Sequence, residues 1–257
     1  MTRVLVVGAA GRMGESLLRG IAASSDLSLG AALEHAAHAR LGSELAPGVK
    51  LTSDPRAACA QADVAIDFSS PASTLALLDA AEARGLPVVI GTTGIDATGD
   101  ARIARAAKRL AIVRAANFSI GITLLLELVA EAARRLEGYE VDVLELHHDQ
   151  KVDAPSGTAL ALARAAAGTR GQELQEVAVY AREGQTGKRD PRAIGLQSLR
   201  LGDSIGEHTV YFAGAGERIE LAHRALSREN FTAGALRAAR WLAGRAPGLY
   251  AMRDVLA

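Results

Sequence analysis

A short apolar strand that runs straight into a glycine-rich turn restricts the fold of this chain more than any other stretch. Residues 3–7 (Arg-Val-Leu-Val-Val) predict a buried strand, and glycines follow at Gly8, Gly11 and Gly14, ahead of a helical pattern. Glycines in such a turn let the backbone approach a phosphate, and the next helix offers unpaired N–H groups at its start. The spacing is G-x-x-G-x-x-G rather than the usual G-x-G-x-x-G, so the motif needs support from its surroundings.

The residue after the second predicted strand supplies that support. Residues 27–33 predict a strand that ends before Glu34, about 20 residues beyond the last glycine, where an acidic side chain would bond adenine ribose hydroxyls. An ordinary glycine turn with an unrelated surface glutamate is the alternative. The next residue, His35, stands where a cationic side chain would meet the 2′-phosphate of NADP. Arg12 and Arg40 could serve instead, but lone basic residues on loops are more often solvated, so the pattern favours NADH or the use of both cofactors.

Strands and helices alternate regularly through the first half of the chain. Predicted strands cover residues 49–52, 63–68, 87–90 and 111–113, and predicted helices cover residues 54–60, 97–110 and a segment entered at Ser70-Pro71. Alternation at this spacing is typical of an α/β fold with a Rossmann-like, doubly wound parallel sheet. Ligands bind such sheets beyond the carboxyl ends of the strands, where loops 69–70, 91–94 and 115–119 carry small residues. After a glycine turn, these loops predict a trough for a dinucleotide, although each alone would be ordinary turn chemistry.

Beyond residue 119 the alternation gives way to a run of strands. A long helix is expected over 120–136, with strands at 139–147, 177–180, 194–201, 207–212 and 218–222. Turn signals at Gly202-Asp203 and Gly214-Ala-Gly216 suggest hairpins, so we expect a second α+β domain built on a mainly antiparallel sheet. A last helix, 231–242, is expected to pack on the first domain. The predicted domains are therefore residues 1–118 with 229–257, and residues 119–228.

The stretch of residues 145–159 carries two histidines, a lysine and two aspartates ahead of a proline turn. It links a predicted strand to a predicted helix, and catalytic groups collect on such loops. A histidine, with an ordinary pKa of about 6.5, can donate a proton near neutral pH. In extended backbone His147 and His148 point to opposite faces, so at most one reaches a reacting atom. Lys151, with Asp153 to orient it, is a cation suited to a carboxylate or an imine-type nitrogen.

The turn after these charges offers a site for an anion. Residues 155–157 (Pro-Ser-Gly) supply a turn, a hydroxyl that can cap the helix and a glycine, beside unpaired backbone N–H groups. Two other interpretations stay open, a solvated charged loop and a metal site made of His147, His148, Asp149 and His208. The metal site is less favoured, because adjacent histidines do not readily chelate one ion and hydride chemistry needs no metal.

Length and charge limit the classes of function. The 257 residues carry 29 basic and 29 acidic side chains, without the basic excess expected of a nucleic-acid-binding protein. The apolar runs are too short to span a bilayer and no signal-peptide layout is present, so we expect a soluble cytoplasmic protein with no membrane partner. The single cysteine, Cys59, cannot form an internal disulfide and is expected to serve packing.

Four stretches together resemble one enzyme family. They are residues 8–14 (Gly-Ala-Ala-Gly-Arg-Met-Gly), 91–94 (Gly-Thr-Thr-Gly), 115–119 (Ala-Ala-Asn-Phe-Ser) and 147–159 (His-His-Asp-Gln-Lys-Val-Asp-Ala-Pro-Ser-Gly-Thr-Ala). The last, which is highly specific, resembles 4-hydroxy-tetrahydrodipicolinate reductase, long called dihydrodipicolinate reductase, of bacterial lysine and diaminopimelate synthesis. Residues 180–184, 202–208 and 252–256 are also similar to the family, so the resemblance covers essentially the whole chain. It implies a homotetrameric oxidoreductase that reduces a cyclic dicarboxylate, 4-hydroxy-tetrahydrodipicolinate, to tetrahydrodipicolinate with NADH or NADPH.

The resemblance also implies roles for individual residues. His147 matches the proton donor and Lys151 the group that holds the substrate, while His148, Gly157 and Thr158 match substrate contacts. The implied cofactor contacts are Gly8, Ala9, Ala10, Gly11, Arg12, Met13, Glu34, His35, Gly91, Thr92, Thr93, Ala115, Ala116, Asn117 and Phe118. No metal is implied. The second domain would bind the substrate and form the oligomer. Many members carry arginine where His35 stands, so the family's use of NADPH does not transfer directly.

Two rival functions stay open. A non-catalytic dinucleotide sensor would use the same N-terminal fold and need neither His147 nor Lys151. A nicotinamide-dependent dehydrogenase of another dicarboxylate is a nearer rival. For the reductase, cofactor groups precede Ser119 and substrate groups follow Tyr139, so the two domains are expected to close over the substrate.

Overall fold

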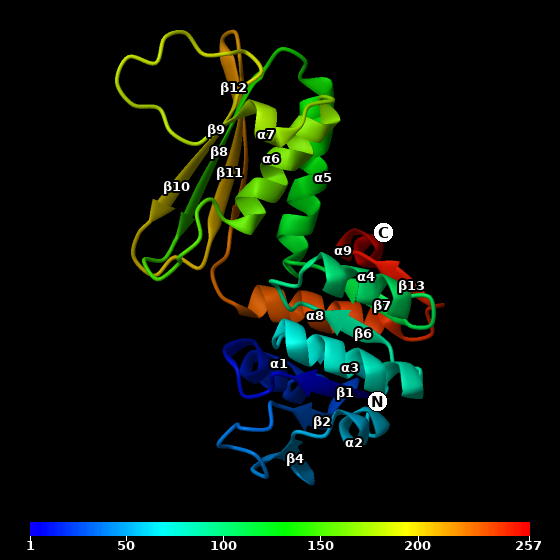
Figure 1. The fold of residues 1–257 in the computed structure, drawn as a ribbon. Helices are drawn as coiled ribbons and strands as arrows, with labels where there is room; N and C mark the ends of the chain where they lie inside the picture. The colour runs from blue at the N-terminus through cyan, green and yellow to red at the C-terminus, as the bar shows by residue number, and fades with distance from the viewer. The chain divides into compact units, whose positions relative to one another are not determined.

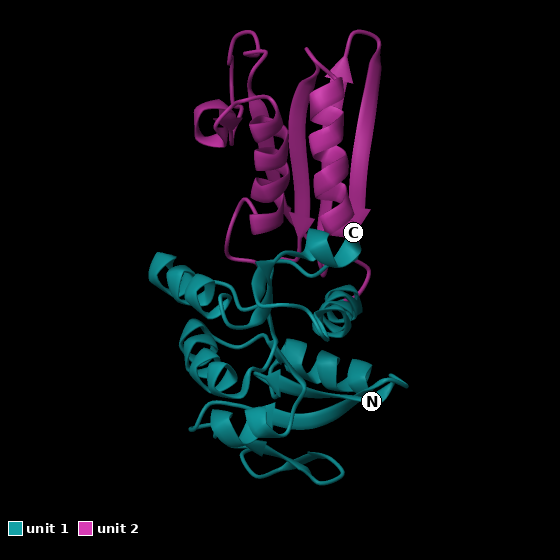
Figure 2. Cartoon of the chain, turned by 90° about the vertical axis from the view of Figure 1, so that its right-hand side faces the viewer, with its two compact units in different colours: residues 1–120, 228–257 teal, residues 121–227 magenta.

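The computed structural model describes residues 1–257, which divide into two compact units. Unit 1 consists of Met1–Ile120 and Arg228–Ala257, and unit 2 of Gly121–Ser227 (Figure 2). The first unit is therefore discontinuous in sequence, with the whole of the second inserted between its two segments. No helix is long and apolar enough to cross a membrane.

Unit 1 is built on a sheet of eight strands. In sequence order they are β1 (Thr2–Val7), β2 (Leu27–Leu33), β3 (Glu44–Ala46), β4 (Val49–Thr52), β5 (Val64–Asp67), β6 (Val88–Ile90), β7 (Ala111–Arg114) and β13 (Gly248–Tyr250). Their order across the sheet is β13-β7-β6-β5-β1-β2-β4-β3, and every pair is parallel except β3 with β4. Strands β2 to β4 lie on one side of β1, and β5, β6, β7 and β13 lie on the other, which confirms the predicted doubly wound sheet.

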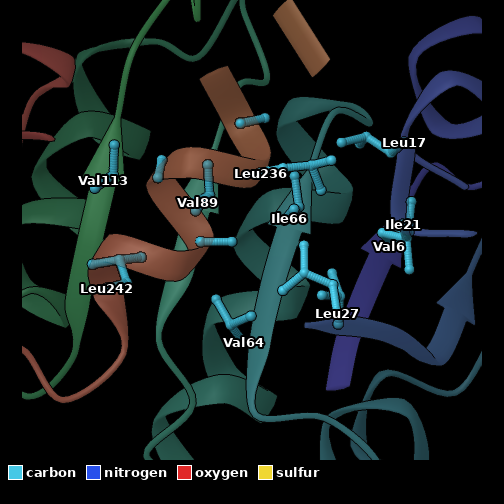
Figure 3. Close-up of a cluster of buried hydrophobic side chains, with 14 of the residues drawn as sticks. Val6, Leu17, Ile21, Leu27, Val64, Ile66, Val89, Val113, Leu236 and Leu242 are labelled. Atoms are coloured by element: carbon cyan, nitrogen blue, oxygen red, sulfur yellow. The ribbon is translucent and has the colours of Figure 1, made fainter. Parts of the chain in front are cut away.

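Helices cover both faces of this sheet. They are α1 (Arg12–Ala22), α2 (Pro55–Ala60), α3 (Pro71–Arg84), α4 (Ala97–Ala106), α8 (Glu229–Leu242) and α9 (Met252–Leu256) (Figure 1). On one face Val6, Ile66 and Val89 pack against Leu17 of α1 and Leu236 of α8 (Figure 3). The central strands β5, β6 and β7 are buried on both faces, which explains why they read as continuous apolar runs. The predicted return of the last helix to the first unit is confirmed.

The opposite face of the sheet is covered by α2, α3 and α4. There Leu5 and Ile90 of the strands pack against Leu77 and Leu78 of α3 and Ile103 of α4. Local sequence fixes where these helices begin, because Asp54, Ser70 and Asp96 each accept a backbone N–H bond as N-cap residues. The starts of the helices, and so the loops before them, are held at the carboxyl edge of the sheet.

Unit 2 is a five-stranded sheet with helices on one face (Figure 1). Its strands are β8 (Glu140–His147), β9 (Ala178–Val179), β10 (Ile194–Arg200), β11 (Glu207–Gly214) and β12 (Glu217–Arg224), and its helices are α5 (Ile120–Arg135), α6 (Gly157–Thr169) and α7 (Leu174–Val177). The three strands of eight residues, β12-β11-β8, are antiparallel, and β8-β10-β9 is parallel. Val143, Val210 and Phe212 form its core with Val129 of α5 and Leu162 of α6.

One of the two predicted hairpins in this unit is wrong. The hairpin at Gly214-Ala-Gly216 joins β11 to β12 as expected. The turn at Gly202-Asp203 also exists, with Gly202 at a φ of +60°, but β10 and β11 are not neighbours because β8 lies between them. The turn signal predicted a change of direction correctly, yet it carries no information about the strand with which each arm pairs.

Candidate active site

The glycine turn after β1 has a geometry that only glycine fits. Gly8 has a φ of +74°, and a Cβ there would lie 2.7 Å from the carbonyl oxygen of Phe68. A Cβ on Gly14 would overlap the carbonyl of Gly8. The first turn of α1 can therefore lie directly against the loop after β1, as it does in dinucleotide-binding folds.

The start of α1 is left open to a ligand. Gly11 is its N-cap residue, and no side chain caps the helix. The first N–H groups of the helix carry the positive end of its dipole and have no partner within the helix. Residues 8–13, which the sequence predicts to hold a pyrophosphate, form this turn and helix start, with Arg12 exposed.

Glu34 follows β2 and faces the same turn. Its carboxylate accepts hydrogen bonds from the backbone N–H groups of Ala10, at 3.2 Å, and His35, at 3.1 Å. These three residues lie close together, and a small cavity of about 120 Å3 runs past Gly8, Glu34, His35 and Ser69. The His35 side chain is exposed and lies edge-on to the ring of His38, with the ring centroids 5.3 Å apart.

Asp67, at the end of β5, joins two loops that the sequence assigned to the cofactor. It is fully buried and accepts hydrogen bonds from the hydroxyls of Ser69 and Thr74, both at 2.5 Å. The backbone N–H of Ser69 also donates to Thr92 Oγ1 at 3.0 Å. Burial raises the pKa of Asp67, although the hydroxyl hydrogen bonds oppose that rise. Sequence reasoning missed Asp67. The available signal was an acidic residue at the carboxyl end of an apolar strand that was predicted to be parallel and buried.

The loop after β7 differs in part from the expectation. Asn117 Oδ1 accepts the backbone N–H of Ser119 at 2.8 Å, which shapes the loop. Phe118, predicted as a cofactor contact, is buried with its ring against that of Phe68, at a centroid distance of 5.4 Å. Its side chain belongs to the core of unit 1, so any contact with a cofactor would come from its backbone. Gly234 of α8 allows this packing, since a Cβ there would overlap the Phe118 carbonyl.

In unit 2, the end of β8 separates the two adjacent histidines as predicted for extended backbone. His147 is buried, 8% exposed, and its Nδ1 hydrogen-bonds to Glu145. His148 is half-buried, and its backbone N–H donates to the carbonyl of Ser204 at 2.7 Å. Its Nδ1 atom is buried and has no hydrogen-bond partner within the chain.

Lys151 lies in the loop that follows. Its ammonium group contacts Asp153 Oδ1 at 2.8 Å, as the sequence suggested, and its side chain is 21% exposed. The carbonyl of Asp153 in turn accepts a hydrogen bond from Arg200 at 2.5 Å. The Lys151 ammonium group is thus held near the ends of β8 and β10, and its side chain is still partly exposed to solvent.

The helix start after the proline turn has the predicted cap. Ser156 Oγ accepts the backbone N–H of Ala159 at 3.1 Å and is bonded to His208 Nε2, also at 3.1 Å. Gly157, the first residue of α6, is exposed, and Thr158 is partly buried. The structure therefore brings His147, Lys151 and the start of α6 together at one end of unit 2.

One of the two buried rings of this cluster, that of His208, is uncharged near neutral pH. His208 lies edge-on to His147 with the ring centroids 5.2 Å apart. Burial, followed by the charge of His147, lowers the pKa of His208 to about 4, so His208 is neutral near pH 7. No three His, Cys, Asp or Glu side chains are arranged to hold a metal ion. Glu145, whose carboxylate contacts His147, is also paired with Arg200.

Comparisons with known proteins agree with this geometry. The family model described as "Dihydrodipicolinate reductase, N-terminus" matches residues 2–118, and "Dihydrodipicolinate reductase, C-terminus" matches residues 121–256. The 4-hydroxy-tetrahydrodipicolinate reductase of Thiobacillus denitrificans is 50% identical over 99% of this chain and 98% of its own length. That of Herminiimonas arsenicoxydans is 46% identical over 99% of this chain and 97% of its own.

Solved structures of similar fold include a reductase of the same family. A dipicolinate-bound dihydrodipicolinate reductase from Paenisporosarcina sp. TG-14 superposes with a TM-score of 0.80 at 25% identity, covering 98% of this chain and 97% of that chain. A probable dehydrogenase from Thermotoga maritima shares the fold, with a TM-score of 0.65 at 15% identity over 98% of this chain and 92% of its own. With both family models matched and relatives near half identity over nearly its full length, the chain belongs to the dihydrodipicolinate reductase family.

Proposed function

We propose that this chain reduces 4-hydroxy-tetrahydrodipicolinate to tetrahydrodipicolinate with a nicotinamide cofactor, in diaminopimelate and lysine biosynthesis. One observation supports the proposal most directly. A buried histidine, a lysine and a capped helix start converge at the end of β8, in a chain that is 50% identical to a reductase of this name. A proton donor, a cation and an anion site are the groups that reduction of a cyclic imine dicarboxylate requires.

The cofactor is proposed to bind along the carboxyl edge of the first sheet. Residues 8–13 would hold the pyrophosphate and Glu34 the adenine ribose, while loops 91–93 and 115–118 would line the nicotinamide end. The bound nicotinamide supplies the hydride. The exposed His35 is the residue nearest in sequence to the ribose site that could meet a 2′-phosphate, and an imidazole lacks the permanent charge and forked donors of an arginine. We therefore favour NADH or the use of both cofactors.

His147 is proposed to give its proton to the substrate as hydride adds. Lys151 would pair with a substrate carboxylate or ring nitrogen and steady negative charge that builds during the reaction. His148, Gly157 and Thr158 would complete the substrate site, with the amide groups at the start of α6 facing a carboxylate. Asp67 would support the cofactor site indirectly, because it helps to fix the loops that carry Ser69 and Thr92.

The chain is proposed to form a homotetramer through unit 2. The face of its sheet that carries no helices holds Leu144, Leu146, Tyr211 and Leu199, none of them buried. Apolar side chains gathered on an open sheet face are typical of an association surface. Light scattering on the purified protein would show a mass about four times that of the 26.7 kDa chain. A cytoplasmic location stays a prediction.

The activity is tested directly with purified protein. Freshly generated 4-hydroxy-tetrahydrodipicolinate should cause oxidation of NADH, NADPH or both, and omission of the substrate should abolish it. A chain that binds cofactor yet oxidises neither cofactor with this substrate would instead be a sensor, or a dehydrogenase of another dicarboxylate. His147→Ala serves as the matched negative control, because it removes the proposed proton donor and leaves unit 1 untouched.

A further inference from the structure

We propose that Glu145 is a positioning residue for His147: its carboxylate holds the imidazole through Nδ1, so that Nε2 is the atom that gives its proton to the substrate. This inference deepens the proposed function and rests on it. Glu145 is 1% exposed, and no step of the proposed reaction otherwise uses it. A buried carboxylate at that position needs a reason, because burying a charge is costly unless it is paired.

Strand register collects the partners of Glu145 on one face of the second sheet. Side chains two apart on a strand share a face, so Glu145 and His147 lie together on the helix-covered face of β8. Across from Glu145 stand Ser198 of β10 and His208 of β11, and across from His147 stands Arg200 of β10. Five polar side chains thus meet where the apolar core of unit 2 ends.

Both carboxylate oxygens of Glu145 accept hydrogen bonds from several donors. Arg200 donates to both oxygens, at 2.9 and 3.0 Å, in the forked geometry of a strong Arg–carboxylate pair. The backbone N–H of Ser156 donates to Oε1 at 3.2 Å, and His147 Nδ1 contacts Oε2. One carboxylate therefore links the ring of the proposed acid to the turn that opens the proposed substrate site.

The ionisation of Glu145 determines which ring nitrogen carries a proton. Burial alone would raise the pKa of Glu145, but hydrogen bonds from His147, Arg200 and Ser198 outweigh it and lower the pKa to about 2. An ionised carboxylate only accepts hydrogen bonds, so the ring nitrogen that faces it must carry hydrogen. The neutral ring of His147 is thereby held as the Nδ1–H tautomer.

Proton transfer then has a defined origin. In the imidazolium form both nitrogens carry hydrogen, and the Nδ1 hydrogen stays bonded to Glu145. When hydride has added to the substrate ring, the Nε2–H bond breaks, the proton passes to the substrate atom that gained electron density, and the electron pair remains on Nε2. The product of this step is the neutral Nδ1–H ring, which solvent reprotonates at Nε2. The role of Glu145 resembles that of a carboxylate that orients a catalytic histidine in hydrolases.

Space beside Nε2 is preserved by a glycine. A Cβ on Gly206 would come 2.9 Å from His147 Nε2, closer than side-chain carbons approach a ring nitrogen. The absence of a side chain at residue 206 therefore leaves room beside that nitrogen. The titratable and charged groups around His147 are Glu145 on its own strand, Arg200 on β10, His208 on β11, His223 on β12, and Lys151 and Asp153 in the following loop.

A purely structural ion pair between Glu145 and Arg200 is the competing explanation, and the tautomer distinguishes the two. In the wild-type protein, long-range 1H–15N correlation spectra of His147 above its titration range should show hydrogen on Nδ1. A ring with hydrogen on Nε2 would overturn the proposal. Because this measurement needs no substrate, it is independent of the proposed function: a chain inactive as a reductase that shows Nδ1–H still supports the positioning role.

Variants supply a second readout. Glu145→Gln should lower kcat at least about tenfold. The upper limit is the loss of about 10⁴-fold that follows when a catalytic histidine loses its orienting carboxylate. It should also shift the alkaline limit of the kcat profile to lower pH, because the imidazolium loses its counter-charge. Glu145→Asp, which keeps the charge, should restore the position of that limit.

The matched control lies on the same strand. Asp142 is also paired with arginines, Arg182 at 2.8 Å and Arg189 at 2.8 Å, but it lies on the opposite face of β8. Asp142→Asn should lower thermal stability without moving the pH limit. If folded Glu145→Gln kept the wild-type pH profile, or if Asp142→Asn moved it equally, Glu145 would be a structural residue and the proposal would be wrong.

Discussion

The carboxylate of Glu34 accepts a hydrogen bond from the backbone N–H of Ala10 at 3.2 Å, which joins the residue after β2 to the glycine turn after β1. The two residues are 24 positions apart, and the parallel pairing of β1 with β2 brings them together. The acidic side chain is therefore already placed at the loop that would hold the pyrophosphate.

Removing this carboxylate should weaken cofactor binding. We expect Glu34→Ala to raise the Kd of NADH by about tenfold or more, the equivalent of one hydrogen bond between a charged group and a ribose hydroxyl. Fluorescence titration of NADH measures it. Glu44→Ala, which removes an exposed carboxylate of the same unit bonded only to a local backbone N–H, should leave the Kd unchanged. Equal effects of the two variants would contradict the assignment of Glu34.

The residue after Glu34 should decide cofactor preference. His35→Arg places a permanent, forked cation where a 2′-phosphate would lie, and it should raise the ratio of kcat/KM for NADPH to that for NADH by about tenfold or more. Steady-state kinetics with both cofactors gives the ratio. An unchanged ratio would mean that the 2′-phosphate is met elsewhere, with Arg12 and Arg40 as the next residues to vary.

Loss of the proposed acid or its neighbouring cation should affect chemistry and not cofactor binding. His147→Ala should lower kcat by roughly 10²- to 10⁴-fold, the usual contribution of a general acid. Lys151→Ala should lower kcat and raise KM, because the same cation would bind the substrate and stabilise the negative charge that builds during the reaction. The Kd of NADH should stay close to wild type for both, since the residues belong to unit 2. Full activity in both variants would show that the site lies elsewhere.

Acid should destabilise the folded chain in two separate windows. The pKa of His208 is about 4 in the folded state against 6.5 ordinarily, so its contribution is complete above pH 6.5 and is lost as pH falls towards 4. The loss amounts to at most about 3 kcal/mol. The contribution of Glu145, whose pKa is about 2, is lost lower, between pH 4.5 and 2. Denaturant melts from pH 7 to 4 should show the first window, and His208→Gln should flatten it.

Binding of both ligands should compact the protein. Hydride transfer requires contact between the nicotinamide and the substrate ring, and the residues proposed for each belong to different units. X-ray scattering with NAD and dipicolinate together should give a smaller radius of gyration than either ligand alone. No compaction with both bound would count against closure.

Much of the fold was predictable because local signals were strong. Residues 27–33 and 49–52 are strands with the predicted bounds, since apolar runs between turn residues read clearly. The short elements β3, α7, β13 and α9 were missed, because three to five residues carry little periodicity. Pairing order was the harder property, as the crossing of the chain from β10 over β8 to β11 shows.

The candidate site shows the same division. His147, Lys151 and the Ser156 cap were found from sequence because they lie within one short stretch. The pairing of Glu145 with Arg200 was not found from sequence, since the two residues are 55 positions apart and only strand register brings them together. Asp67 was overlooked although two of its hydroxyl partners, Ser69 and Thr74, follow within seven residues; the third, Thr92, is brought there by the pairing of β5 with β6.

The insertion of unit 2 into unit 1 has a consequence for biosynthesis. As the chain leaves the ribosome, the side of the first sheet that carries Ile66 and Val89 is covered only in part, by α1, until α8 has emerged. Unit 2, whose residues are contiguous, can finish folding earlier. We expect unit 2 to complete its folding before unit 1, and the nascent chain to depend most on chaperones while residues 120–242 emerge.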